Sequence, residues 1–191
     1  PTLFPYTTLF RSSRTGDVIA SSLTGELTVG LANNTADNDI SITTGSNTTT
    51  VNGSASGDDI TVNASALANN VLLTLGGAGD FVVNNLQGNL AAMGLTGELT
   101  VDLADASDNT ISVSTGSGTT QLNGSDAGDT ITVNAVALAD DTSLTVAGAG
   151  AFTVSSLTGD LVASSLSGSL TVSLADNTAD NDISITTGSG T

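Results

Sequence analysis

The stretch LTGELTVGLANN at residues 23–34 returns as LTGELTVDLADA at 95–106 and as LSGSLTVSLADN at 166–177. These starts are 72 and 71 residues apart (95 − 23 and 166 − 95), and 42 of 71 aligned pairs in the first two copies are identical. Self-similarity at a fixed period is typical of arrays whose units pack on their neighbours. We therefore divide the chain into four parts: 13–22 (end of a preceding repeat), 23–94 (repeat 1), 95–165 (repeat 2) and 166–191 (partial repeat 3).

Apolar residues alternate with polar ones inside each repeat, which is the pattern of a half-buried β-strand. The second copy separates the two faces, because Val82 becomes Thr153 whereas Phe81 is kept as Phe152. With Val51 counted, a repeat holds about seven short strands separated by Gly, Asn, Asp and Ser turns, and no stretch has helical periodicity. The predicted inward set is Leu27, Val29, Leu31, Ile40, Ile42, Ile60, Val62, Val71, Leu73, Leu75, Phe81, Val83 and Leu90.

The chain is therefore predicted to be all-β, and two architectures compete. A parallel β-solenoid (β-helix) would stack the copies in one continuous core, whereas tandem Ig-like β-sandwiches would give each repeat its own core. The repeat is shorter than a sandwich of about 100 residues. The motif Leu-x-Gly-x-Leu at 86–90 and 95–99 recurs after nine residues, which we interpret as the step of one rung. The hairpin dipeptides Asn52-Gly53 and Asn123-Gly124 favour sandwiches, but loop-like sequence follows them. We predict the solenoid.

Composition excludes several function classes. The chain has 19 acids against two Arg or Lys, a net charge of −17, so it lacks the basic face that nucleic acids and anionic membranes need. No apolar run is long enough for a membrane-spanning helix. There is no His, Cys or Lys to act as base or nucleophile, and Ser169 replaces the equivalent Glu26 and Glu98 in the third copy. We expect no enzymatic activity.

The first twelve residues differ in composition from the rest. They hold the only Tyr and both Pro, and TLFPYTTLFRS (2–12) resembles the translation of a sequencing adapter. We therefore exclude 1–12 from fold reasoning. Because no initiator Met is present and the third repeat is partial, we expect the chain to be a metagenomic fragment of a longer protein.

Calcium is the one cofactor that the sequence suggests. Calcium-binding β-rolls repeat G-G-x-G-x-D-x-U-x, in which Asp and turn carbonyls supply oxygen ligands. The run GGAGDF (76–81) starts in the same way, but its Asp comes one residue early and the motif is not repeated every nine residues. The competing interpretation is that the acids cap turns. The candidate metal ligands, all in Gly- and Asn-rich turns, are Asp37, Asp39, Asp58, Asp59, Asp129, Asp180 and Asp182.

The phrases GDDITVNASALA (57–68) and GDTITVNAVALA (128–139) resemble the β-strand repeats of large bacterial surface or secreted proteins, some of them adhesins or haemolysin-type calcium-binding proteins. The resemblance implies an extracellular or cell-surface, elongated protein. We expect this segment to be a stalk or spacer of an adhesin-like or surface-layer-like protein. The alternatives are a calcium- or glycan-binding module and, less favoured, the non-catalytic flank of a β-helical polysaccharide enzyme. A cell-surface glycan, or self-association through neighbouring repeats, would supply its partner.

Overall fold

The structure is a computed structural model that describes residues 8–11, 16–31, 39–105, 109–176 and 182–190. Its described residues form two nine-stranded sheets and no helix. The odd sheet holds, in spatial order, β1 (Thr8–Arg11), β3 (Leu27–Gly30), β5 (Thr49–Gly53), β7 (Leu72–Gly77), β9 (Asn89–Leu95), β11 (Thr110–Ser114), β13 (Thr130–Asn134), β15 (Ala151–Leu157) and β17 (Leu170–Leu174). The even sheet holds β2 (Val18–Ile19), β4 (Asp39–Thr43), β6 (Asp59–Asn63), β8 (Asp80–Leu86), β10 (Leu99–Leu103), β12 (Thr120–Gly124), β14 (Ser143–Gly148), β16 (Asp160–Val162) and β18 (Ile185–Thr186).

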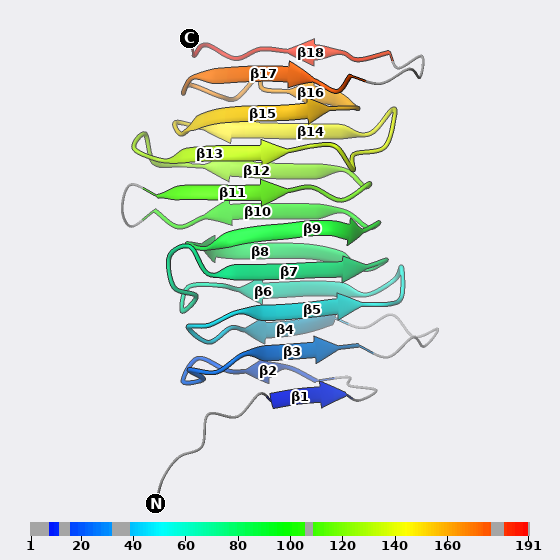
Figure 1. Cartoon of the computed structure of the whole chain (residues 1–191), viewed down its shortest axis with the longest axis vertical. Helices are drawn as coiled ribbons and strands as arrows, with labels where there is room; N and C mark the ends of the chain where they lie inside the picture. Colours follow the sequence, from blue (N-terminus) through cyan, green and yellow to red (C-terminus); the bar gives the residue numbers. More distant parts are fainter. Residues whose placement is uncertain (1–7, 12–15, 32–38, 106–108, 177–181, 191) are drawn as a thin grey trace, which may run out of the picture.

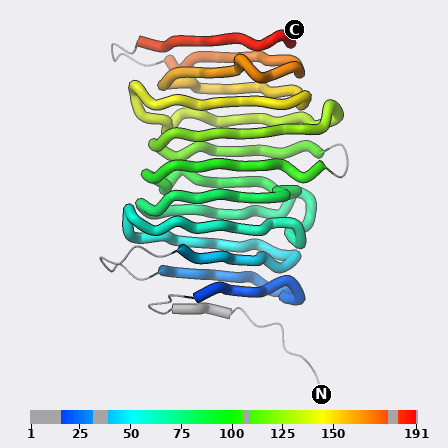
Figure 2. Tube along the Cα trace, turned by 180° about the vertical axis from the view of Figure 1, so that it is seen from behind, coloured from blue at the N-terminus to red at the C-terminus, as the bar shows by residue number. Residues whose placement is uncertain are grey.

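The chain passes from one sheet to the other after every strand, so that two strands make one coil. Every strand pair within a sheet is parallel, and Figure 1 shows the arrows of the two sheets pointing in opposite directions. Seen from behind, the trace is a single stack of coils with its two ends at opposite ends of the stack (Figure 2). The predicted parallel β-solenoid is confirmed, and separate sandwiches with antiparallel hairpins are wrong.

The nine-residue spacing that we interpreted as one rung is half a coil. In the even sheet, Ile40 pairs with Ile60, Ile60 with Phe81 and Phe81 with Leu99. These steps of 20, 21 and 18 residues are the lengths of full coils (60 − 40, 81 − 60 and 99 − 81). The nine residues from Leu86 to Leu95 lead from the end of β8 to the end of β9, which lies in the opposite sheet. The Leu-x-Gly-x-Leu motif therefore marks a turn between sheets.

The core is one continuous cluster that runs through all the copies. The whole predicted inward set is buried except Val71, which packs against the cluster while partly exposed. Phe81 and Phe152 are each 1% exposed, whereas Val82 is 41% exposed on the outer face. The alternation of apolar residues therefore determines which side chains fill the space between the sheets.

The Asn-Gly dipeptides end strands and do not form hairpins. Gly53 is the last residue of β5 and lies on the buried face. A Cβ on this glycine would lie 2.3 Å from Cδ1 of Ile60 and 3.4 Å from the ring of Phe81. Gly124 faces Phe152 in the same way, with a Cβ-to-ring distance of 3.4 Å. These glycines leave room for the aromatic rings across the core.

Each repeat contains an odd number of strands. Repeat 1 contributes seven, β3 to β9, and at two strands per coil this is three and a half coils. The first strand of repeat 2, β10, therefore lies in the even sheet although its counterpart β3 lies in the odd sheet. Likewise Phe81 belongs to the even sheet and Phe152 to the odd sheet. Successive repeats are thus related by half a turn about the long axis.

Most of the excluded segment 1–12 lies outside the described residues. Its described part, β1, pairs in parallel with β3 at one end of the odd sheet. The strand that β1 borders, β3, is the first strand of repeat 1.

Candidate functional site

Three of the chain's acids form a line across the outer face of the even sheet. Asp39 pairs in register with Asp59, and Asp59 with Asp80, as the corresponding residues of β4, β6 and β8. We call Asp39, Asp59 and Asp80 the acidic ladder. Neighbouring strands are about 4.8 Å apart, so that like charges lie directly opposite one another, which is unfavourable in a sheet. The parallel register, and not closeness in sequence, brings these carboxylates together.

A shallow depression of about 280 Å³ lies at the start of the acidic ladder. It is lined by Asp17, Asp39 and Asp59, together with Ile40, Ser41 and Thr61. Three carboxylates from three successive coils therefore border one hollow of the surface. Such an arrangement concentrates negative potential and attracts cations.

The structure separates the candidate pair Asp58 and Asp59. Asp58 is 0% exposed, whereas Asp59 is exposed, because adjacent residues entering a strand point to opposite faces. Asp129, the counterpart of Asp58, is 1% exposed, and its Oδ1 accepts a hydrogen bond from the backbone N of Asn109 at 3.0 Å. Of the other candidates, Asp182 is exposed beside the last strand, and Asp37 and Asp180 lie outside the described residues.

The acidic ladder of repeat 1 is not kept in repeat 2. In repeat 2 the equivalent line is Thr110, Thr130 and Ala151, which stack in the odd sheet. Within the described residues, no group of three or more Asp or Glu side chains is arranged to hold one metal ion. A calcium ion needs six to eight oxygen ligands. The ladder is therefore an electrostatic surface on which water or backbone carbonyls would have to complete any coordination shell.

The clearest recurring role of the acidic and amide side chains is to bridge coils. Oδ1 of Asp17 accepts a hydrogen bond from the backbone N of Ser41 at 3.0 Å. The equivalent bonds run from Ser112 N to Asn89 Oδ1 at 2.9 Å, and from Ser184 N to Asp160 Oδ1 at 2.8 Å. We call these three interactions the inter-coil brackets. Each joins residues 23 or 24 positions apart, one coil to the next.

An inter-coil bracket supplies a side-chain acceptor in place of a backbone carbonyl, at the point where the backbone pairing of two strands begins. The described pairing of β9 with β11 starts at Leu90 with Val113, and Asn89 precedes it on the same strand. Asp80 of the acidic ladder does similar work, since its Oδ1 accepts the backbone N of Glu98 at 2.7 Å. Sequence reasoning missed these positions. The signal was present in the repeat alignment, where only Asp or Asn, both acceptors at Oδ1, occupies positions 17, 89 and 160.

No helix among the described residues is long and apolar enough to cross a membrane. Comparison of the chain with protein-family models, with curated proteins and with solved structures found no match.

Proposed function

We propose that this chain is a stiff spacer, the repeat region of an elongated extracellular protein of a bacterial surface. The observation that carries the proposal is the single core shared by all the copies. Because each coil rests on the previous one in parallel register, a further repeat lengthens the same body and adds no hinge. The role is mechanical: the array sets a distance between whatever lies at its two ends.

The acidic surface supports this role. Long solenoids expose strand edges and flat sheet faces that can pair with other molecules, and charged side chains oppose such pairing. With a net charge of −17, neighbouring rods would repel one another. The resemblance to surface-protein repeats points to the same setting.

Small-angle X-ray scattering of lengthened arrays tests the spacer. One or two extra copies of residues 95–165 are inserted in tandem after residue 165. Three and a half coils at about 4.8 Å each predict that every copy adds about 17 Å to the longest dimension, with an unchanged cross-section. A length that grows as the square root of the copy number, as in a flexible chain, would contradict the proposal.

Cation binding is the second candidate, and the acidic ladder is the observation that favours it. Calorimetric titration of calcium in high sodium chloride separates a site from general screening. Saturable heat that is lost in Asp59→Thr would support a site on the ladder. The control Asp102→Asn removes a carboxylate elsewhere on the even sheet and should leave that heat unchanged. No saturable heat would leave the ladder with only a structural and screening role.

A further inference from the structure

The turn that follows β4 and β11 has the sequence Thr-Gly-Ser, and a third copy of it begins at Thr187. In repeat 2 this turn is Thr115-Gly116-Ser117. A Cβ on Gly116 would clash with the carbonyl oxygen of Leu95, and the backbone N of Ser117 donates to that same oxygen at 3.0 Å. The close approach of two coils thus accounts for the glycine and for the path of the backbone. The threonine needs a separate explanation.

The threonines of the first two turns are buried, and the protein makes no use of their hydroxyl groups. Thr44 and Thr115 are each 0% exposed. Neither Oγ1 atom has a hydrogen-bond partner within the part of the chain that the structure describes. A buried hydroxyl without a partner lowers stability, so valine, which has nearly the same shape, would be the more stable residue in a dry core. Threonine is nevertheless kept in all three copies, whereas a core position such as Val51 becomes Leu122 in the second.

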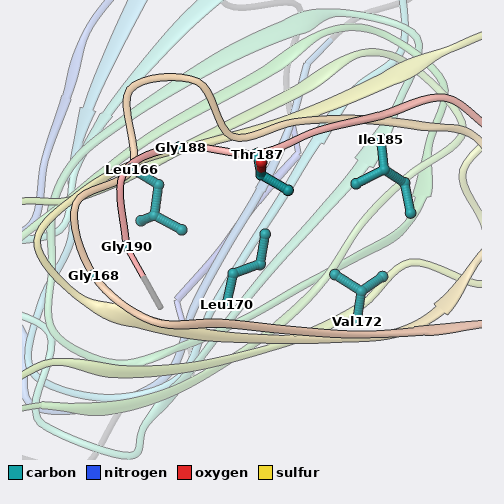
Figure 3. A pocket seen from close by; sticks show the side chains of 8 residues that line it. All are labelled: Leu166, Gly168, Leu170, Val172, Ile185, Thr187, Gly188 and Gly190. Carbon is teal, nitrogen blue, oxygen red and sulfur yellow. The ribbon is translucent and has the colours of Figure 1, made fainter.

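Alanine side chains flank each threonine in the stack of coils. The threonine lies one residue beyond the last described pairs of its strand, so its neighbours follow from the register: the columns are Ala20–Thr44–Ala64, Ala92–Thr115–Ala135 and Ala163–Thr187. Every alanine of the hydrophobic cluster, together with Ala20 that packs against it, lies in one of these columns, and all other members of the cluster are Val, Leu, Ile or Phe. In the third copy, Thr187 and Gly188 line one hollow with Leu166 and Leu170, so that threonine too is directed toward the inside of the coil (Figure 3).

Backbone carbonyl groups lie at the same corner of the coil. A Cβ on Gly116 would lie 2.9 Å from the carbonyl oxygen of Ala92 and closer still to that of Leu95. Neither oxygen accepts a hydrogen bond from the hydroxyl of Thr115. A carbonyl oxygen has two lone pairs, so one that already accepts a backbone N–H can accept a second donor. Polar groups that are near one another without direct contact are commonly joined by a water molecule.

We propose that Thr44 and Thr115 each hold one buried water molecule, which accepts from the threonine hydroxyl and donates to backbone carbonyls of the adjoining coil. A buried water typically makes about three hydrogen bonds to otherwise unpaired groups, and the flanking alanines are the smallest side chains of the cluster. Hydroxyl and carbonyl groups carry no net charge, so a neutral ligand is favoured over a cation, whose burial without a carboxylate is costly. Because β4 lies in the even sheet and β11 in the odd sheet, successive repeats place their water in opposite sheets. The inference does not rest on the spacer role.

High-resolution crystallography of the full chain tests the proposal directly. We expect an ordered water about 2.5–3.0 Å from Oγ1 of Thr44 and of Thr115. In solution, oxygen-17 relaxation dispersion counts long-lived internal waters. Thr44→Val and Thr115→Val should each remove one water from that count, and the double variant should remove two. Thr132→Val makes the same substitution on the exposed face of β13 and should leave the count unchanged.

Thermal unfolding separates a hydrated corner from a dry one. With water bound, Thr115→Val should lower Tm by about 2–4 °C, because the hydrogen bonds to the water are lost. Thr115→Ser keeps the hydroxyl and should keep the water in the dispersion count. A rise in Tm of Thr115→Val, which is the result for a dry unpaired hydroxyl, would overturn the proposal. So would a crystal structure without ordered water at either threonine, a hydroxyl bonded directly to a protein carbonyl, or a dispersion count unchanged in both valine variants. If a valine variant does not fold, the crystal structure of the parent chain still decides between the two corners.

Discussion

Two adjacent glycines in β7 differ in what they need from the backbone. Gly77 has φ of +101°, and a Cβ there would lie 2.0 Å from the carbonyl oxygen of Gly53. At Gly76 the nearest atom to such a Cβ is 3.7 Å away, and Ala147 already fills the equivalent place in repeat 2. Substitutions at Gly76 and Gly77 therefore separate the effect of a positive φ from the effect of replacing any glycine.

We therefore expect Gly77→Ala to lower the free energy of unfolding by about 2–3 kcal/mol, because alanine is strained at positive φ. Gly76→Ala should change it by less than about 0.5 kcal/mol. Urea unfolding followed by circular dichroism measures both. Similar losses in the two variants would show that replacement of a glycine as such, and not the positive φ of Gly77, determines the effect.

The two core phenylalanines give the second residue-scale prediction. Phe152→Ala should cost about 3–5 kcal/mol, because the buried ring would leave a cavity opposite Gly124. Val82→Thr should cost under about 1 kcal/mol, since Val82 faces outward and Thr153 is its counterpart. Thermal unfolding compares them, and equal shifts in Tm would contradict the assignment of the two faces.

At the scale of strands, the inter-coil brackets predict which acids stabilise the fold. Asp160→Ala removes the acceptor for Ser184 N and should cost about 1–2 kcal/mol, whereas Asp160→Asn should keep most of the stability because Asn89 makes the same bond. Chemical denaturation of the two variants checks this. Equal losses would mean that the carboxylate charge, and not the hydrogen bond, matters at this position.

For the acidic ladder we expect the opposite effect on stability: replacing one of its acids should raise the free energy of unfolding. Asp59 lies between two other carboxylates in register, so Asp59→Thr, the residue found at position 130, should raise the free energy of unfolding by about 0.3–1 kcal/mol at low salt. The gain should shrink in 1 M sodium chloride, where the Debye length is only about 3 Å. A gain that is independent of salt would point to strand propensity instead.

Sequence reasoning succeeded where a property belongs to one strand and failed where it depends on the next coil. Alternation and the comparison of copies predicted that Phe81 lies inward and Val82 outward. The same reasoning could not show that Gly53 makes room for an aromatic ring from the opposite sheet. Nor could it separate buried Asp58 from exposed Asp59, or place Asp39 beside Asp59, because the register between coils is set by turn lengths. The brackets at Asp17 and Asp160 were missed for this reason.

At the scale of the whole molecule, stability is distributed along the stack. Each coil contacts the coils before and after it, and the hydrophobic cluster has no break among the described residues. Such arrays gain stability from intrinsic and nearest-neighbour terms.

The half turn between successive repeats makes the parity of the copy number matter as well as its size. Adding one repeat advances the chain along the axis and moves whatever follows to the opposite side of the rod, apart from the twist of the stack. Adding two repeats returns it to the original side. Two proteins built from this unit that differ by a single repeat would thus direct their distal parts toward opposite neighbours, although their lengths are similar. Gain or loss of one repeat by recombination would act as a change of orientation.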